Sequence, residues 1–390
     1  MSAAFAILVG FTSGTPTGTA SFEPLASGRT TASATLSAVG LAVRPFVDRS
    51  RPNWGHTGPR PLNTVIWYPA PAQTPTTPLP LTEKTKIYFG DAGMAAYFKS
   101  IPIAFDAPLL AGPRRPLILL SHGSTGLGLS LEWLAQSLAA QGYIVAAVNH
   151  HGNTIAEDKL LPQGFGLPWE RADDLSAVLN ALLADPVFGP AIDPARIGAA
   201  GHSAGGETMI AIAGGRFNRA RLMSYCASDA SRGDATCEPR DAIRQSIVDI
   251  AALDRTDPAV HASLQRSRLS HGDNRIRAVF AMAPAMGPAF DSSDLASIHI
   301  PVAIVVGDAD DTAPSKTNAA HFARLIKGAK LTVLPNVGHL TFSSECSPEG
   351  LKAFVSCRDR DGVDRGAIQR AVAQKAYRFF EAAWTPHHQP

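Results

Sequence analysis

Apolar residues in this chain are concentrated in short runs, separated by segments rich in glycine, proline and polar residues. Unbroken apolar runs of about five residues are typical of parallel strands, because a parallel sheet is covered on both faces. We predict about eight strands. They lie at residues 36–47, 63–68, 116–120 and 144–148, in the run that begins at Arg196, and at residues 278–283, 302–306 and 331–334.

The first two strands are predicted to form an antiparallel hairpin, and the later six alternate with segments of helical period. This alternation predicts parallel strands joined by helical crossovers. The fold class is therefore α/β, with a mostly parallel sheet and helices on both faces. The helices that carry this prediction lie at residues 131–140, 169–183, 207–213, 319–326 and 366–383.

Two stretches depart from this alternation. Residues 216–274 contain one predicted helix, at 241–253, and no strand, so we expect a lid-like insertion there. Residues 82–113 have no clear period but contain five aromatic residues, Tyr88, Phe89, Tyr97, Phe98 and Phe105. These side chains either line a substrate cleft or cover an edge of the sheet, and both alternatives stay open.

Residues 1–34 are predicted to be a leader ahead of a single domain at 35–390, because residues 12–34 are rich in Ser, Thr, Gly and Pro. The apolar stretch from Ala3 to Phe11, followed by small residues to Ala20, resembles a signal peptide without its basic segment. Cleavage within residues 1–20 therefore stays open. No apolar stretch reaches the roughly 18 residues that a membrane span needs.

Composition narrows the function classes. The chain has 390 residues, of which 45% are hydrophobic and 17% charged, as is typical of a globular protein. Its 35 basic and 33 acidic residues give a net charge of +2 without long runs of one sign. Because nucleic-acid surfaces need clustered basic side chains, we expect no nucleic-acid partner.

A Gly-x-Ser-x-Gly motif, from Gly201 to Gly205, lies between a predicted strand and a predicted helix. This is the pattern of a nucleophile elbow, in which the chain turns so sharply that the serine adopts a strained backbone conformation. A Cβ atom at either flanking glycine is expected to clash. Residues 193–196 predict a turn before the strand, and the motif predicts Ser203 as a nucleophile above the sheet.

A serine hydroxyl needs a base to take its proton, and that base needs a carboxylate to fix its tautomer. In proteins with such an elbow, the acid and the histidine follow the serine along the chain. His339 follows the last predicted strand, and Asp308, Asp310 and Asp311 follow the strand before it. We predict Asp310 as the acid, with Asp308 and Asp311 as caps of the turn or of the next helix.

Two backbone N–H groups are expected to bind the oxyanion that forms when the serine attacks. They belong to Ala204, next to the nucleophile, and to Ser124, in the glycine-rich loop after residues 116–120. His122 and His202 are predicted to fix loops and not to catalyse. Because no residues have metal-ligand spacing and no dinucleotide-binding motif follows a strand, we expect neither a metal nor a cofactor.

Together these motifs resemble the α/β-hydrolase superfamily, and within it the bacterial dienelactone-hydrolase-like and platelet-activating-factor-acetylhydrolase-like serine esterases. The resemblance implies that Ser203, Asp310 and His339 form a catalytic triad and that Ser124 joins the oxyanion hole. True dienelactone hydrolases have Cys in place of Ser203, so the resemblance implies an ordinary carboxylic ester as the small-molecule substrate. It extends from about Val39 to Phe380 and rests on residues 67–70, 120–123, 149–153, 171–175, 201–206, 307–310 and 338–339.

The expected reaction is therefore ester hydrolysis through an acyl-enzyme. An amidase or peptidase with the same triad is one alternative, and a non-catalytic binding protein on the same scaffold is another. The acyl group, the alcohol and the oligomeric state stay open, because residues 82–113 and 216–274 show no pattern that indicates a pocket shape.

Four cysteines complete the sequence evidence. Cys226 and Cys237 are 11 residues apart, and so are Cys346 and Cys357. Nearest-neighbour pairing predicts two disulfides, because each loop then closes without crossing the sheet. Four cysteines allow three pairings, and four reduced, buried thiols are a further alternative. Since disulfides persist in oxidising compartments, this prediction favours a periplasmic or secreted protein over a cytoplasmic one.

Overall fold

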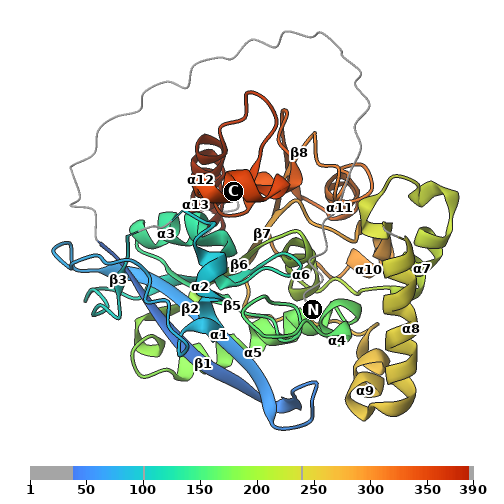
Figure 1. Ribbon diagram of the computed structural model, residues 1–390, viewed down its shortest axis with the longest axis horizontal. Coiled ribbons are helices and arrows are strands. Elements are labelled where there is room, and N and C mark those ends of the chain that lie inside the picture. The colour runs from blue at the N-terminus through green and yellow to red at the C-terminus, as the bar shows by residue number, and fades with distance from the viewer. Residues whose placement is uncertain (1–37, 100–101, 239, 386–390) are drawn as a thin grey trace, which may run out of the picture. The chain divides into compact units, whose positions relative to one another are not determined.

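The centre of the protein is a sheet whose last six strands along the chain are parallel (Figure 1). The computed structural model describes residues 38–99, 102–238 and 240–385, and within them the sheet has nine strands in the order β3-β1-β2-β5-β4-β6-β7-β8-β9. The strands are β1 (Ala38–Pro52), β2 (Pro59–Ala70), β3 (Ala104–Phe105), β4 (Arg115–Ser121), β5 (Ile144–Val148), β6 (Ile192–His202), β7 (Ala278–Met282), β8 (Val302–Gly307) and β9 (Lys330–Leu334).

Helices cover both faces of this sheet, since every residue of β5, β7 and β8 is buried. Figure 1 shows α3 and α13, which contact each other, on one side of the sheet, and α5 and α6, also in contact, on the other. The helices are α1 (Lys86–Phe89), α2 (Ala92–Ala95), α3 (Glu132–Ala140), α4 (Pro162–Gly166), α5 (Glu170–Ala184), α6 (Ala204–Ile212), α7 (Arg219–Ala227), α8 (Arg240–Thr256), α9 (Pro258–Arg266), α10 (Ser292–Leu295), α11 (Ala319–Leu325), α12 (Pro348–Ala353) and α13 (Arg365–Trp384).

The predicted α/β class with a mostly parallel sheet is confirmed, but the prediction of about eight strands missed β3. That strand has two residues, which pair with Gly40 and Leu41, and so short a segment has no period. The turn predicted at residues 193–196 lies within the bounds of β6, where the pairing with β4 is interrupted. Ile192 pairs with Arg115 and Ile197 with Leu117, and between them the Asp193 carboxylate accepts from the Ala195 N–H at 3.0 Å.

Residues 216–274 form α7, α8 and α9, and the described part of this segment contains no strand, as predicted. Helix α8 packs on α4, and Ile250 of α8 lies directly against Gly166 of α4. A Cβ atom at Gly166 would lie only 2.3 Å from the Ile250 Cγ1 atom. Helix α9 contacts the start of α5, since Ser263 Oγ lies 3.0 Å from Trp169 Nε1. The proposed lid role of this insertion stays a prediction.

Both predicted disulfides are present. Cys226 is bonded to Cys237, with 5.2 Å between their Cα atoms, and Cys346 to Cys357, with 5.7 Å. One bond joins the end of α7 to the turn that follows it, and the other encloses α12. Neither bond crosses the sheet.

Aromatic side chains of residues 82–113 pack against other aromatic side chains of the fold. Phe89 lies 6.3 Å from Phe105, ring centre to ring centre, and Phe105 belongs to the edge strand β3. Tyr97 packs edge-on against Phe354, 4.9 Å away, beside the second disulfide. These contacts favour the alternative in which the aromatic residues cover the sheet edge.

The predicted leader at residues 1–34 lies outside the described residues. None of the helices in the described part of the chain combines the length and apolar character needed to cross a membrane.

Candidate active site

Ser203 lies at the sharp turn between β6 and α6, with φ 58° and ψ −119°, a conformation that residues other than glycine rarely adopt. Hydrogen bonds on both sides hold this strained backbone. The Ser203 N–H donates to the Met282 carbonyl at 3.0 Å, and the Ser203 carbonyl accepts from the N–H groups of Glu207 and Ala285. The end of β7 and the first turn of α6 therefore fix the serine above the sheet.

The two glycines of the motif are needed because backbone atoms pack directly against both positions. A Cβ at Gly205 would lie 2.0 Å from the Ser121 carbonyl oxygen, and one at Gly201 would lie 2.3 Å from the Gly205 oxygen. Real Cβ atoms do not approach backbone atoms this closely. The clash predicted from the sequence is thus present at both positions.

Ser203, His339 and Asp310 form one hydrogen-bonded chain. The Ser203 Oγ lies 2.8 Å from His339 Nε2, and His339 Nδ1 lies 2.8 Å from Asp310 Oδ2. His339 and Asp310 are buried, whereas Ser203 is half-buried and accessible. All three follow parallel strands, β6, β9 and β8, at the carboxyl edge of the sheet.

The three aspartates after β8 have different surroundings. Only Asp310 contacts His339, and its other oxygen accepts hydrogen bonds from the N–H groups of Thr312 and Ala313, at 3.1 and 2.7 Å. Asp308 is exposed and accepts from the Asn336 N–H at 2.7 Å, so it bridges two loops. Asp311 is also exposed.

The two predicted oxyanion donors belong to two segments next to Ser203, the start of α6 and the loop after β4. Ala204 begins α6, so its N–H belongs to the helix N-terminus, where the helix dipole favours negative charge. The loop that carries Ser124 touches the nucleophile, since a Cβ at Gly123 would lie 3.2 Å from Ser203 Cβ. Within the described residues, neither N–H donates a backbone hydrogen bond.

His122 and His202 each bind a backbone carbonyl of the loops around Ser203. The His202 ring lies 4.7 Å from the His339 ring, and its Nε2 lies 3.0 Å from the His339 carbonyl. His122 Nδ1 lies 2.7 Å from the Gly123 carbonyl. Burial, together with the nearby His339 for His202 and Arg171 for His122, holds the pKa of both imidazoles well below its ordinary value. Both rings are therefore neutral donors, which agrees with the predicted loop-fixing role.

Sequence reasoning missed a buried polar network beneath this site, although the three segments that supply it, residues 120–123, 149–153 and 171–175, were noted. It joins Ser121, His150, Arg171 and Asp174, all at most 2% exposed. Glu207, one turn after Ser203, is also fully buried, and burial raises its pKa to about 8. The signal in the sequence was the presence of Arg171 and Asp174 on the apolar side of a helix that also carries Leu175 and Val178.

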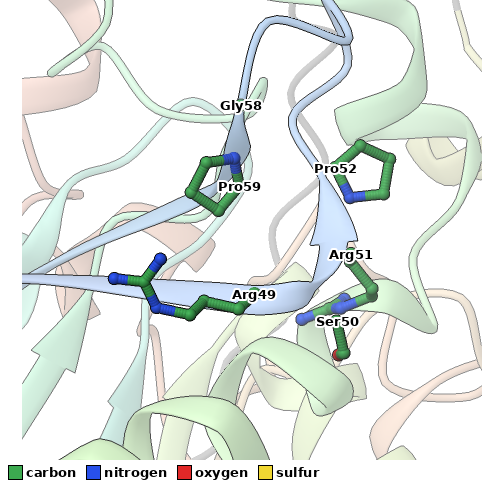
Figure 2. Close-up of a pocket in the computed structure, with 6 residues that line it drawn as sticks. All are labelled: Arg49, Ser50, Arg51, Pro52, Gly58 and Pro59. Carbon is green, nitrogen blue, oxygen red and sulfur yellow. The ribbon is translucent and has the colours of Figure 1, made fainter.

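A hollow of about 400 Å³ lies elsewhere, at the turn end of the β1–β2 hairpin (Figure 2). Figure 2 shows it between Arg49, Ser50, Arg51 and Pro52 of β1 on one side and Gly58 and Pro59, where the turn joins β2, on the other. Its wall residue Arg51 is engaged by Asp48, Glu170 and Asp174. No group of three potential metal-ligating side chains occurs among the described residues.

The nine-stranded, mostly parallel sheet and the strained serine between β6 and α6 define an α/β hydrolase. The family model described as "Alpha/beta hydrolase family" matches residues 117–353, more than half of the chain, and the protein belongs to this family.

Two known proteins are similar to this chain. Over 84 residues it is 36% identical to Lipase 1 of Moraxella sp. (strain TA144), a match that covers 22% of this chain and 23% of the lipase. The match thus spans about a quarter of that relative. A ferulic acid esterase from Streptomyces cinnamoneus has the same fold, with a TM-score of 0.59 and 20% identity over 90% of this chain and 91% of that one.

Proposed function

We propose that this protein is a serine esterase that hydrolyses carboxylic esters of small molecules through an acyl-enzyme. The observation that carries the proposal is the hydrogen-bonded chain from Ser203 Oγ through His339 to Asp310, with the serine accessible above the sheet. The names of the two similar proteins, a lipase and an esterase, also support ester chemistry.

In this mechanism Asp310, as a carboxylate, accepts the Nδ1–H of His339, which leaves Nε2 free to take the Ser203 proton. The serine oxygen then attacks the ester carbonyl. The N–H groups of Ala204 and Ser124 bind the developing oxyanion, and His339 returns the proton to the leaving alcohol. Water, activated by the same histidine, attacks the acyl-enzyme and releases the acid.

An amidase or peptidase is the nearest alternative, because the same triad cleaves amides. A non-catalytic binding protein on this fold is the alternative outside enzymes. An esterase is preferred because the two similar proteins are named as a lipase and an esterase. Ser203 in place of the cysteine of true dienelactone hydrolases favours an ordinary carboxylic ester over a dienelactone as the substrate.

The test uses nitrophenyl esters of graded acyl length, matched anilides and labelling with a fluorophosphonate probe. Ser203→Ala should abolish labelling and lower kcat by roughly three orders of magnitude or more, since residual turnover comes only from binding and the oxyanion hole. Ser356→Ala, at an exposed serine, is the matched control. Near-wild-type hydrolysis by Ser203→Ala would exclude a serine hydrolase, and faster cleavage of the anilides would indicate an amidase.

We also propose that the protein acts in the periplasm or outside the cell, because both cysteine pairs are bonded. The test is non-reducing peptide mapping of protein taken from its native compartment. Cys226–Cys237 and Cys346–Cys357 peptides support export, whereas four thiols that react with an alkylating reagent would support the cytoplasmic alternative.

A further inference from the structure

A second Ser–His–Asp chain lies inside the protein, behind the loop that carries Ser124. The Ser121 Oγ lies 2.9 Å from His150 Nε2, and His150 Nδ1 lies 2.9 Å from Asp174 Oδ2. Ser121 and Asp174 are 0% exposed and His150 is 1% exposed, so no substrate reaches this serine. A buried set with this geometry needs a role other than nucleophilic attack.

The hydrogen bonds of this second chain have one consistent direction. Burial alone would raise the pKa of Asp174, but Arg60 and Arg51, each 2.7 Å from Oδ1, hold it well below its ordinary value. As a carboxylate, Asp174 only accepts, so His150 donates through Nδ1–H. Burial and the nearby Arg171 lower the pKa of His150 to about 3, so Nε2 is unprotonated and accepts from the Ser121 hydroxyl.

With its proton directed at His150, the Ser121 oxygen accepts from Arg171, whose Nη2 lies 3.2 Å away. The same Nη2 donates to the carbonyl oxygen of His122. The guanidinium is therefore held between the Ser121 hydroxyl and the first carbonyl of the loop that leads to Ser124.

The next carbonyl of the loop is held as well. The backbone N–H of His150 donates to His122 Nε2 at 3.2 Å, which places the His122 proton on Nδ1, 2.7 Å from the Gly123 carbonyl. The Gly126 N–H donates to the same carbonyl at 3.1 Å. Two donors thus fix the direction in which the Gly123 carbonyl points.

That direction determines where the Ser124 N–H points. The Gly123 carbonyl and the Ser124 N–H belong to one peptide group, which is planar and trans, so they point in opposite directions. Gly123 packs directly against Ser203, where a Cβ would lie 3.2 Å from the Ser203 Cβ. A small rotation of this peptide would therefore move the N–H relative to the nucleophile.

We propose that Ser121, His150 and Asp174, acting through Arg171 and His122, are positioning residues that hold the Ser124 N–H toward the oxyanion. The inference rests on the proposed esterase function. Oxyanion donors stabilise the transition state because they are oriented before the reaction starts, so a loosened donor affects kcat more than substrate binding.

Ser121→Ala is the test variant, because it removes one buried oxygen and leaves the backbone of β4 in place. Asp174 is less suitable because it also binds Arg51 and Arg60. We expect kcat for a short nitrophenyl ester to fall about tenfold with KM within twofold, less than the loss of a whole oxyanion donor. A trifluoromethyl ketone adds to the Ser203 hydroxyl, and its carbonyl oxygen then becomes an oxyanion. Binding of this inhibitor should weaken by a similar factor.

Two further variants keep the test decisive. Thr64→Val removes another fully buried hydroxyl, which bonds the Leu62 carbonyl, and should leave kcat and inhibitor binding unchanged. Ser121→Cys keeps a weak donor and should lose less activity than Ser121→Ala. The cysteine variant also provides the test if the alanine variant does not fold. Unchanged kcat and inhibitor binding in both Ser121 variants, with Ser203→Ala inactive, would overturn this inference alone. An active Ser203→Ala would overturn the proposed function.

Discussion

His339 is held at three points, which limits its motion relative to Ser203. Its Nδ1 contacts Asp310 and its Nε2 contacts Ser203, each at 2.8 Å, and its carbonyl accepts from His202 Nε2 at 3.0 Å. His202 is the residue immediately before the nucleophile. The elbow therefore positions the candidate base through its backbone as well as through the serine hydroxyl.

At this scale Asp310→Asn is expected to lower kcat/KM by about 10⁴, because an amide cannot fix the His339 tautomer as a carboxylate does. Asp308→Asn should lose less than about tenfold, since the amide oxygen can still accept from the Asn336 N–H and no catalytic group is touched. The measurement is kcat/KM on a short nitrophenyl ester, with circular dichroism to verify folding. A larger loss in Asp308→Asn or in Asp311→Asn would assign the acid differently.

Among the elements, β4, β6 and α6 meet at one point beneath the candidate site. The Ser121 carbonyl at the end of β4 passes so close to α6 that only glycine fits at position 205. Gly338, beside the candidate base, has room for a side chain. A Cβ atom added there would have only Thr341 Oγ1 within 4 Å, at 4.0 Å, and the φ of −91° suits any residue.

We therefore expect Gly205→Ala to destabilise the protein by about 3 kcal/mol or more and to abolish activity, because a backbone atom cannot move aside cheaply. Gly338→Ala should change stability by less than about 1 kcal/mol. Urea unfolding followed by circular dichroism measures both, and nitrophenyl ester hydrolysis measures activity. Equal effects of the two substitutions would contradict the packing described at the elbow.

The elements predicted from the sequence were those with a strong apolar period. Helix α7 was missed because, of its nine residues, only Cys226 is buried. Helix α9 buries only Val260 and Ser263, yet its start was readable, since Asp257 caps it ahead of Pro258. Short helices such as α1 and α2, like β3, have too few residues to show a period.

The residues of the candidate site likewise fall into those that the sequence predicted and those that it did not. Ser203, Asp310 and His339 each follow a strand in the expected order, so their positions along the chain were enough to predict that they meet at one edge of the sheet. The contact between Ser121, His150 and Asp174 depends instead on side-chain directions at separations of 29 and 24 residues, and no local motif encodes it. The buried network behind the loop therefore required the structure.

For the whole molecule, folding is coupled to protonation through a carboxyl group buried under the elbow. Glu207 lies on α6 with 0% exposure, and within the described residues neither of its oxygens has a hydrogen-bond partner. Burial raises its pKa from an ordinary value of 4.5 to about 8, although Arg171 and His271 oppose the rise. At neutral pH the folded protein thus holds a proton that the unfolded chain has released.

Glu207→Gln should isolate this effect. Between pH 4.5 and about 8 the folded wild type binds one proton more than the unfolded chain, so its free energy of unfolding falls as pH rises through this window. The fall is at most about 1.4 kcal/mol per pH unit. Glutamine does not titrate, so the stability of the variant relative to wild type should increase from pH 5 to pH 8. Urea unfolding at pH 5, 6.5 and 8 measures the difference, with Glu349→Gln, on the exposed side of α12, as control. If the stability of Glu207→Gln relative to wild type is the same at all three pH values, or increases toward acid pH, Glu207 is ionised in the folded protein.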